Sequence, residues 1–508
     1  MAAIPRLFQR PPLPPQSLAH IAAFMSTKFL DVSPPIHRVV KDELNRDLFK
    51  KSVSVLAAKV SPARTGAILK AEAMRRSIID LPKVKSVVSK PDGSRLVLLR
   101  FSEEADLPPD TRQLLDAERA ELVTHTLHFD YNYWTADDIL NAILPEHLIE
   151  GKPSGYAAVG HVAHLNLNSE YLPYKHVIGQ IMLDKNPSIK TVVNKLDSIH
   201  NQFRFFKMEL IAGEPNYIVE HPESDCKFTF DFSQVYWNSR LHTEHARLID
   251  LFKPEDVIAD VFAGVGPFAV PAGKKGCGVL ANDLNPASYK YLQINIDNNN
   301  VGIGFENQEG SNRYSPVTIS HAQVSSLVRP FCEDGKDFIR SVAARVFDVP
   351  LPPAVPPKSK TQQYREQRRE REANAQIKQC ESSIQSSPPP IRTSLPQRNR
   401  ITQFVMNLPD SAIQFLDAFR GIFSSDNAGG RDLSGVYDKT TLPMVHCYCF
   451  TRELEPDKAA VDIRKRVEER LGGQLNEEVS FHLVRSVAPN KEMYCISFRL
   501  PQEIAFGG

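Results

Sequence analysis

The chain has 508 residues, a formal net charge of +1 and a hydrophobic fraction of 42%. At roughly 150 residues per domain, this length predicts about three structural units with a large core. The near-zero charge excludes a globally basic chain, so any binding of nucleic acid has to come from local patches. No apolar run approaches the ~18 residues of a membrane helix, which predicts a soluble protein without a membrane partner.

The seven cysteines are scattered and show neither the C-x-x-C spacing of a zinc site nor an even disulfide framework. This pattern is typical of a reducing compartment. We therefore expect no bound metal.

Residues 1–35 contain Arg6, Arg10 and Lys28, with no acidic residue among the first thirty. Arginine residues without acidic residues are typical of a mitochondrial presequence. Translation that starts at Met25 would omit this segment. A disordered Pro-rich tail fits the composition equally well, so both interpretations stay open.

Residues 36–150 combine a helix-like stretch at 63–79 with a strand candidate at 95–101 and carry no chemical motif, which predicts a recognition or scaffold domain. Residues 151–240 alternate short apolar runs with Pro, Gly and Asn and predict a small mixed β domain. Its strands are expected at 157–167, 177–183, 191–193, 206–211 and 227–231.

A helix is predicted from the segment VYWNSRLHTEHARLIDLF, in which apolar residues recur at helical spacing after a capping Asn238 or Ser239. Arg240 and Glu244 fall four residues apart on one face. A surface ion pair is the simplest alternative, but Arg before Glu is the less favourable order for helix stability. We therefore predict that this pair points into an active site.

A nucleotide site is predicted where the apolar run 257–259, a buried parallel strand, leads into a turn at Gly264 and Gly266. A second short strand ends in Asp283, which is placed to accept hydrogen bonds from both hydroxyls of a ribose. Glycine turns and polar strand ends occur in any parallel α/β sheet. The spacing of the carboxylates nevertheless favours a ribose cofactor.

Two departures from the dehydrogenase pattern identify that cofactor. Phe268 and Ala269 replace the third glycine, which would bring a helix close under a pyrophosphate. Asp260, at the end of the first strand, repels phosphate but suits the ammonium and sulfonium groups of S-adenosylmethionine. We therefore predict S-adenosylmethionine as the cofactor.

The domain 241–508 continues with a helix at 287–299 and with Asp334 as a third acidic strand end near the adenine. The insertion 348–400 is polar, proline-rich and net positive, and predicts a disordered or partly helical linker.

The strand 401–406 is predicted to be the fourth strand of a doubly wound order, and it places Asn407 beside the transferred group. The segments 479–487 and 493–500 predict an antiparallel hairpin. A mostly parallel, doubly wound sheet that ends in such a hairpin is the α/β fold of class I S-adenosylmethionine-dependent methyltransferases. Here it follows a small mixed β domain and an N-terminal domain.

The chain resembles one family closely, the eukaryotic and archaeal tRNA (guanine-37-N1)-methyltransferases. The matching segments, in order, are GHVAHLNL, VVNKLDSIHNQFRFFKMELIAGE, VYWNSRLHTEHARL, DVFAGVGPF, NDLNP, MNLP, VHCYCF and VRSVAPNKEMYCISF.

The resemblance implies methyl transfer from S-adenosylmethionine to N1 of the guanine on the 3′ side of the anticodon. In the family this modification guards the reading frame. The resemblance also implies binding of the anticodon loop and, through the N-terminal domain, of the tRNA body. We expect a monomer in the mitochondrial matrix, the cytoplasm and the nucleus, where family members act.

Guanine N1 carries a proton at neutral pH, so the reaction needs a base, and the released charge collects on O6. By position in the family motifs, Glu244 is implied as the base and Arg204 as the cation for O6. Asn407 would hold the guanine edge, and Arg240 would orient Glu244 or bind phosphate. The implied cofactor residues are His245, Asp260, Phe262, Gly264, Gly266, Asp283, Leu284, Asp334, Gly335 and Asn407.

Many N-methylating enzymes carry N-P-P-Y at the fourth strand, whereas this chain has N-L-P-D and lacks the aromatic platform. Base stacking is therefore expected from Tyr236 or Trp237, after the base has left the stack of a single-stranded loop.

Two alternatives stay open. One is the wybutosine-pathway enzyme that transfers the aminocarboxypropyl group of the same cofactor on the same scaffold. The set of Glu244, Arg204 and NLP favours the methyltransferase, because removal of the N1 proton is not the sister enzyme's task. The other is a tRNA-binding protein without catalytic activity.

Overall fold

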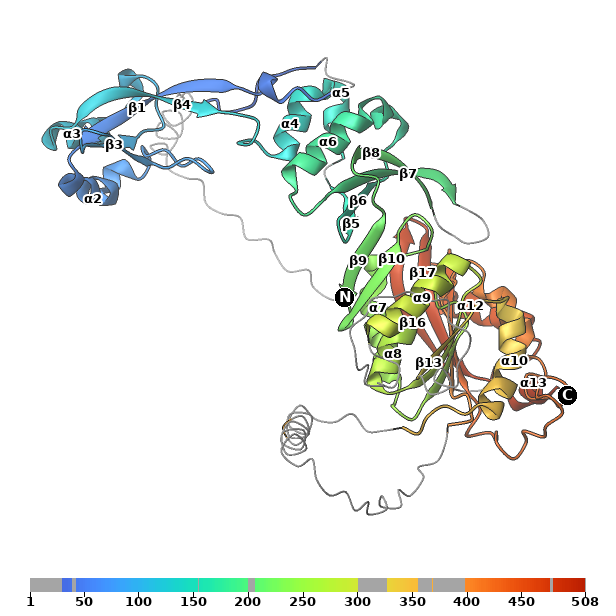
Figure 1. The fold of residues 1–508 in the computed structure, drawn as a ribbon. Coiled ribbons are helices and arrows are strands. Elements are labelled where there is room, and N and C mark those ends of the chain that lie inside the picture. The colour runs from blue at the N-terminus through green and yellow to red at the C-terminus, as the bar shows by residue number, and fades with distance from the viewer. Residues whose placement is uncertain are drawn as a thin grey trace, which may run out of the picture. The chain divides into compact units, whose positions relative to one another are not determined.

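In the computed structural model the described residues are 30–38, 43–153, 155–199, 206–299, 327–354, 368, 398–475 and 478–507. The chain divides into two units (Figure 1). Unit 1 comprises residues 1–156, 167–187 and 211–213, and unit 2 comprises 157–166, 188–210 and 214–508. The domain boundaries expected at 150 and 240 stay predictions.

Unit 1 contains an antiparallel sheet with the strand order β2-β3-β1-β4. Buried Ile68 and Leu115 close a core over this sheet. The helix expected at 63–79 is shorter, because it ends at Lys70 and a separate 3-10 turn follows. The elements are β1 Lys51–Val60, α2 Pro62–Lys70, β2 Val87–Ser89, β3 Arg95–Leu98, α3 Pro109–Ala117 and β4 Glu121–Phe129.

A helical part completes unit 1, with α4 (Ala136–Ile143), α5 (Glu146–Ile149) and α6 (Lys175–Lys185). The strand expected at 177–183 is wrong, because this segment is α6. Packing overrides the strand preference of Val and Ile here, because the apolar residues are buried at helical spacing. The buried residues are Val177, Ile178, Ile181 and Met182.

Unit 2 begins with two small β structures, a sheet with the order β5-β6-β7-β8 and the hairpin β9-β10. The strands expected at 191–193, 206–211 and 227–231 are confirmed, whereas the run expected at 157–167 forms two short antiparallel strands, β5 and β6. The sequence did not predict β9, because its residues IVEHPE are largely polar. The strands are β5 Ala157–Val159, β6 Val162–Leu165, β7 Thr191–Ile199, β8 Phe206–Gly213, β9 Ile218–Glu223 and β10 Cys226–Asp231.

The main sheet of unit 2 has seven strands in the order β13-β12-β11-β14-β15-β17-β16. The strands from β13 to β15 are parallel, and β17 and β16 form an antiparallel hairpin at the edge. The predicted fold class is confirmed. The strands are β11 Val257–Asp260, β12 Gly278–Asn282, β13 Val328–Phe331, β14 Gln403–Met406, β15 Met444–Thr451, β16 Val479–Ala488 and β17 Lys491–Arg499.

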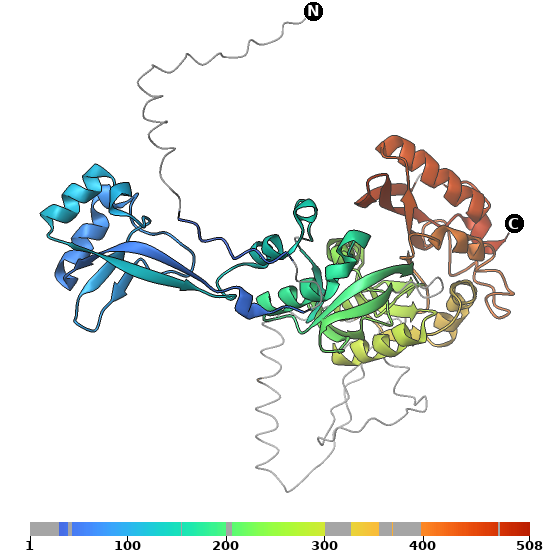
Figure 2. The ribbon, with the colours of Figure 1, turned by 90° about the horizontal axis from the view of Figure 1, so that it is seen from above.

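Helices cover both faces of the main sheet (Figures 1 and 2). Apolar residues of α7 (His242–Leu251), α8 (Ala269–Lys275) and α9 (Pro286–Asn298) pack into the core on one face. The core on the other face is closed by α10 (Gly335–Asp348), the 3-10 helix η7 (Ala412–Phe419) and α12 (Pro456–Leu471). Both helical layers leave the strand ends free to hold a site.

The insertion expected at 348–400 lies mostly outside the described residues. Its two ends meet, because the Leu351 N–H donates a 2.8 Å hydrogen bond to the Arg398 carbonyl.

Candidate active site

Two acidic side chains lie at the carboxyl ends of neighbouring strands. Asp260 is the last residue of β11, and Asp283 follows β12. In the strand order β11 lies between β12 and β14, where the direction of winding reverses. Open parallel sheets bind their ligands at such a switch point.

Asp260 is fully buried, and neither of its carboxylate oxygens has a hydrogen-bond partner among the described residues. Burial raises the pKa of Asp260 well above its usual range, and the charge of Asp283 raises it further. The nearby backbone N–H of Phe262 opposes this shift without forming a hydrogen bond of normal geometry. An unpaired buried carboxylate is costly, and a cationic group such as an ammonium would supply the missing partner.

Asp283 holds the turn that follows β11. Its Oδ2 accepts a 2.8 Å hydrogen bond from the Gly264 N–H, and its Oδ1 accepts one of 2.8 Å from the Asn285 N–H. The Ser288 side chain also donates to this carboxylate, so about one of its four acceptor positions remains for a ribose hydroxyl. A Cβ added to Gly264, where φ is +57°, would meet no atom within 4 Å, so this turn borders open space.

Four further residues of the predicted cofactor set lie around these strand ends. The Phe262 ring meets the Phe415 ring edge-on at 4.9 Å, and a Cβ at Gly335 would lie only 2.9 Å from Phe262. Asp334 is exposed and caps α10 through a 2.8 Å hydrogen bond from a backbone N–H. Leu284 is 41% exposed.

Asn407 follows β14, and its side-chain oxygen is buried without a hydrogen-bond partner among the described residues. A cavity of about 800 Å³ opens at the ends of β14 and β15, with Pro409, Phe450 and Arg452 in its lining, but Asn407 does not line it. The Lys491 ammonium lies 3.9 Å from the centre of the Phe450 ring. This volume suits a nucleotide-sized ligand.

Glu244 on α7 is the centre of a polar cluster, and its side chain is 4% exposed. Arg247 donates from Nε to Oε2 at 2.7 Å and from Nη2 to Oε1 at 2.6 Å. The Tyr448 hydroxyl of β15 donates to Oε1 at 2.7 Å, and Nε2 of His482 on β16 lies 3.3 Å from Oε2. Burial raises the pKa of Tyr448 well above its usual range, so the hydroxyl keeps its proton.

His245 contacts a different carboxylate. Its Nδ1 lies 2.5 Å from Oε1 of Glu223, at the end of β9, and its ring meets Phe268 edge-on at 4.7 Å. The second Glu223 oxygen is buried without a hydrogen-bond partner among the described residues, and Nε2 of His221 lies 3.9 Å from it. His245 is thus fixed next to the start of α8.

Arg240 does not pair with Glu244 among the described contacts, in contrast to the expected arrangement. It is exposed in a 3-10 turn, so the α-helix begins only at His242. The guanidinium bound to Glu244 belongs to Arg247. The pKa of His164 is lowered to about 4, first by burial and then by the charges of Lys195 and Arg240, and burial and the Arg240 charge lower the pKa of Lys195. Arg204 lies outside the described residues.

Sequence reasoning missed four residues of these clusters. Arg247 lies three residues after Glu244, a spacing that a helix brings together, so the local sequence carried this signal. Tyr448, His482 and Glu223 reach the clusters through strand pairing, for which no local signal exists.

The two aromatic candidates for base stacking differ in exposure. Tyr236 is 45% exposed, whereas Trp237 is 7% exposed and packs against Phe228 and Phe230 with ring centres 5.4 and 4.8 Å away. Trp237 is therefore part of the core, and of the two only Tyr236 is available to a ligand.

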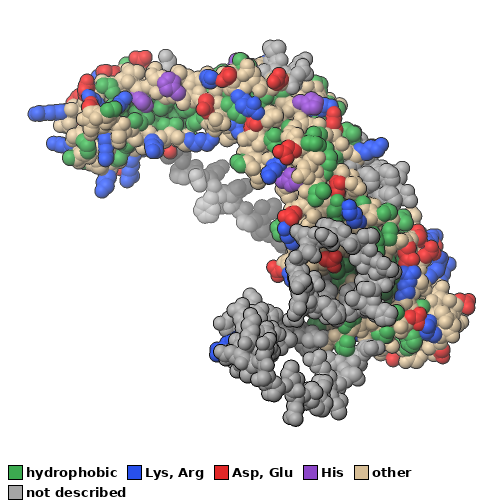
Figure 3. All heavy atoms as spheres, viewed as in Figure 1, with side chains coloured by type: hydrophobic (Ala, Val, Ile, Leu, Met, Phe, Trp, Pro, Cys, Tyr) green, Lys and Arg blue, Asp and Glu red, His purple; other side chains and the backbone are tan. Residues whose placement is uncertain are grey.

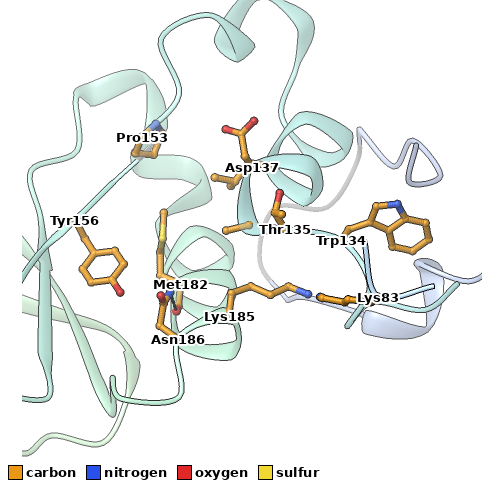
Figure 4. A pocket seen from close by; sticks show the side chains of 11 residues that line it. Lys83, Trp134, Thr135, Asp137, Pro153, Tyr156, Met182, Lys185 and Asn186 are labelled. Atoms are coloured by element: carbon orange, nitrogen blue, oxygen red, sulfur yellow. Dashed lines mark hydrogen bonds between the residues drawn. The ribbon is translucent and has the colours of Figure 1, made fainter. Parts of the chain in front are cut away.

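A second cavity, of about 360 Å³, lies in unit 1 (Figure 4). Figure 4 shows the Lys185 side chain extending toward Lys83. Lys83 donates to the backbone carbonyls of Asn132 and Tyr133, and Lys185 to that of Tyr131. Both lysines therefore stabilise the loop at residues 131–133 through hydrogen bonds to its backbone.

The described part of the chain holds no group of three or more His, Cys, Asp or Glu residues placed to bind a metal. None of the described helices is long and apolar enough to cross a membrane.

The doubly wound sheet with its terminal hairpin and the acidic strand ends at the switch point define a class I methyltransferase domain. Residues 219–348 match the family described as the TRM5/TYW2 methyltransferase domain, and residues 136–216 match the TYW2 N-terminal domain. The chain is 54% identical to the tRNA (guanine(37)-N(1))-methyltransferase of Coprinopsis cinerea, over 94% of this chain and 98% of that protein. It belongs to the tRNA (guanine(37)-N1)-methyltransferase family.

Further relatives extend the match. The enzymes of the same name from Cryptococcus neoformans and Schizosaccharomyces pombe are each 42% identical, over 97% and 91% of this chain and 93% and 94% of theirs. The structure of Trm5b from Pyrococcus abyssi aligns with a TM-score of 0.50 and 19% identity, over 88% of this chain and 99% of that one. The complex of aTrm5 with tRNALeu aligns with a TM-score of 0.52 and 16% identity, over 88% and 100%. At these identities the two structures show the fold alone.

Proposed function

We propose that this protein transfers a methyl group from S-adenosylmethionine to N1 of guanine 37 in tRNA. The observation that carries the proposal is the buried Glu244 carboxylate, which Arg247 and Tyr448 hold in one orientation. A carboxylate fixed in this way beside a cofactor domain suits the removal of a proton from a bound base.

The proposed cofactor site rests on acidic strand ends, of which Asp260 lacks a hydrogen-bond partner among the described residues. The Asp260 carboxylate would bind the ammonium group, and Asp283 would bind the ribose hydroxyls. Gly264 leaves the space that the cofactor needs, and the exposed Leu284 and the carboxylate of Asp334 would contact the adenine. When bound, S-adenosylmethionine supplies the methyl group on an electron-poor sulfur.

The residues of the chain would then make guanine N1 nucleophilic. Glu244 would take the N1 proton, and the charge on O6 would be met by Arg204, as the family motif implies. Asn407 would accept a hydrogen bond from the guanine edge with its unpaired oxygen. We propose that Arg240, with Lys195, binds backbone phosphate instead of orienting Glu244.

The tRNA body would be bound by unit 1, because its segment 64–100 contains nine Lys and Arg residues against three Asp and Glu. Figure 3 shows Lys and Arg side chains projecting from this part of the molecule. Clustered exposed cations are the electrostatic signature of a phosphate-binding surface. All nine are exposed: Arg64, Lys70, Arg75, Arg76, Lys83, Lys85, Lys90, Arg95 and Arg100.

Single-turnover kinetics of Glu244→Gln test the proposal. We expect the methyl-transfer rate to fall by roughly 100-fold or more, in the range of general-base catalysis, while the tRNA affinity stays near that of the wild type. Arg204→Ala should likewise lose rate more than affinity. The control is Asp250→Asn, which removes an exposed carboxylate from the same helix and should retain the full rate. Full activity in Glu244→Gln would remove Glu244 as the base.

The protein is also proposed to act in mitochondria as well as in the cytoplasm and nucleus. The support is the acid-free N-terminus with Arg6, Arg10 and Lys28. Fluorescent fusions that start at Met1 or at Met25 test this, because only the first should reach mitochondria. Equal distribution of the two fusions would contradict the proposal.

A further inference from the structure

Three side chains form a row across the antiparallel edge of the main sheet. Tyr448 of β15 lies opposite Cys495 of β17, and Cys495 lies opposite His482 of β16. Directly opposed residues of antiparallel strands point to the same face. The row therefore leads from the interior of the sheet to its edge strand.

Glu244 lies over this row and connects its two ends. Its Oε1 accepts from Tyr448, and its Oε2 faces Nε2 of His482 at 3.3 Å. The Glu244 side chain is 4% exposed and the His482 side chain 45%, so the imidazole joins a buried carboxylate to water.

The four contacts of Glu244 differ in length and in whether the partner can take up a proton. A carboxylate offers about four acceptor positions, and Arg247 takes two of them and Tyr448 one. Neither of these groups can remove a proton from Glu244, because Arg247 stays charged and the Tyr448 pKa lies far above neutrality. His482 has the longest contact, and its imidazole can accept a proton on one ring nitrogen and donate one from the other.

We propose that His482 relays to water the proton that Glu244 takes from guanine N1; this inference rests on the proposed function. The N1–H bond breaks, and a carboxyl O–H bond forms on Glu244. After methyl transfer the carboxyl proton passes to Nε2 of a neutral His482, and the imidazolium releases a proton from Nδ1 to water. Glu244 is then an anion again, and one proton has left the site per methyl group.

The groups that face this path are Glu244 and Arg247 on α7, Tyr448 on β15 and Cys495 on β17. Burial raises the pKa of the Cys495 thiol to about 12, with a further rise from Glu244, so the thiol stays neutral during turnover. Among these described neighbours His482 is therefore the group that can exchange the proton with solvent.

His482→Gln tests the relay, because an amide can donate to Glu244 but cannot carry its proton. We expect a single-turnover methyl-transfer rate within about twofold of the wild type, because Glu244 starts as an anion. Steady-state kcat should fall by roughly 100-fold, the lower end of the range for proton transfer by a positioned side chain, with partial recovery as imidazole buffer is raised. Leu483→Gln, on the same strand and the opposite face, should change neither rate.

Two results would overturn the inference. One is a His482→Gln enzyme with wild-type kcat and no dependence on imidazole. The other is an equal loss in single-turnover and steady-state rates without rescue, which would make His482 a support for Glu244. If the wild-type enzyme itself formed no 1-methylguanosine, the proposed function would fail, and this outcome is distinct from both.

Discussion

Tyr448 and Glu244 are 204 residues apart in the chain, yet the Tyr448 hydroxyl donates a 2.7 Å hydrogen bond to the Glu244 carboxylate. The hydrogen bond joins the fifth strand along the sheet to the helix that precedes β11. It fixes a buried charge at the position where the proposed reaction needs a base.

Tyr448→Phe should lower both stability and activity. The substitution leaves a buried carboxylate oxygen with one partner fewer, and loss of a hydrogen bond to a charged group costs about 1 to 3 kcal/mol. Urea unfolding and single-turnover kinetics measure the two effects. Tyr291→Phe is the control, because its hydroxyl has no hydrogen-bond partner in the described structure, and it should change little. Equal effects of the two substitutions would contradict this assignment.

Asp260→Asn should stabilise the ligand-free protein at alkaline pH and weaken the binding of S-adenosylmethionine. Burial and Asp283 raise the pKa of folded Asp260 above that of the unfolded chain. The folded state thus binds this proton more tightly, and stability is lost as the pH rises from the unfolded pKa of about 4 through the raised folded pKa.

Thermal unfolding of both proteins across this pH range measures the effect. The variant's advantage should be complete above the folded pKa and absent below the unfolded one. Calorimetry should show about 10-fold to 100-fold weaker cofactor binding, the loss expected for a charge-assisted hydrogen bond. A variant that binds the cofactor normally would remove Asp260 from the site.

The two glycines of the turn should respond differently to alanine. A Cβ at Gly266, where φ is +98°, would lie 2.7 Å from Val270, so Gly266→Ala should cost roughly 2 to 5 kcal/mol from left-handed strain and overpacking. Gly264→Ala should cost only about 1 to 2 kcal/mol, because its Cβ meets no atom within 4 Å, but it should block the cofactor. Denaturant unfolding and cofactor titration separate the two; normal cofactor binding by Gly264→Ala would contradict the site.

Removal of cations from unit 1 should weaken tRNA binding in a salt-dependent way. The triple variant Lys85→Ala, Lys90→Ala and Arg95→Ala should bind tRNA less tightly. The slope of log affinity against log salt should fall by about 0.7 to 0.9 for each phosphate that the variant no longer neutralises. The double variant Lys458→Ala and Lys465→Ala, on α12, is the control. An unchanged slope in the triple variant would show that this surface does not bind phosphate.

The sequence predicted the parallel part of the main sheet well, because strands such as β11 and β12 are apolar runs that end at or next to acidic residues. The run 257–259, the turn at Gly264 and the acidic residue Asp283 all lie within one short stretch of the chain. Local sequence was therefore sufficient to predict this part of the fold. The segment 177–183 was mispredicted as a strand, because its Val and Ile residues favour a strand while packing in unit 1 makes it helical.

The polar clusters of the candidate site could be predicted from the sequence only in part. The helix start at His242 decides that Arg247, and not Arg240, binds Glu244, and a shift of a few residues in a boundary changes the partner. Tyr448 and His482 depend on the order of β15, β17 and β16, which no local pattern specifies.

The proposed methyl transfer is tested most directly with methyl-labelled S-adenosylmethionine and two tRNA transcripts that differ only in guanine or adenine at position 37. Nucleoside analysis follows the reaction of the purified protein. We expect label in 1-methylguanosine from the guanine transcript alone. The absence of methyl label from both transcripts would contradict the proposed function, and cofactor labelled in the aminocarboxypropyl chain would then distinguish the sister transferase from a tRNA-binding protein.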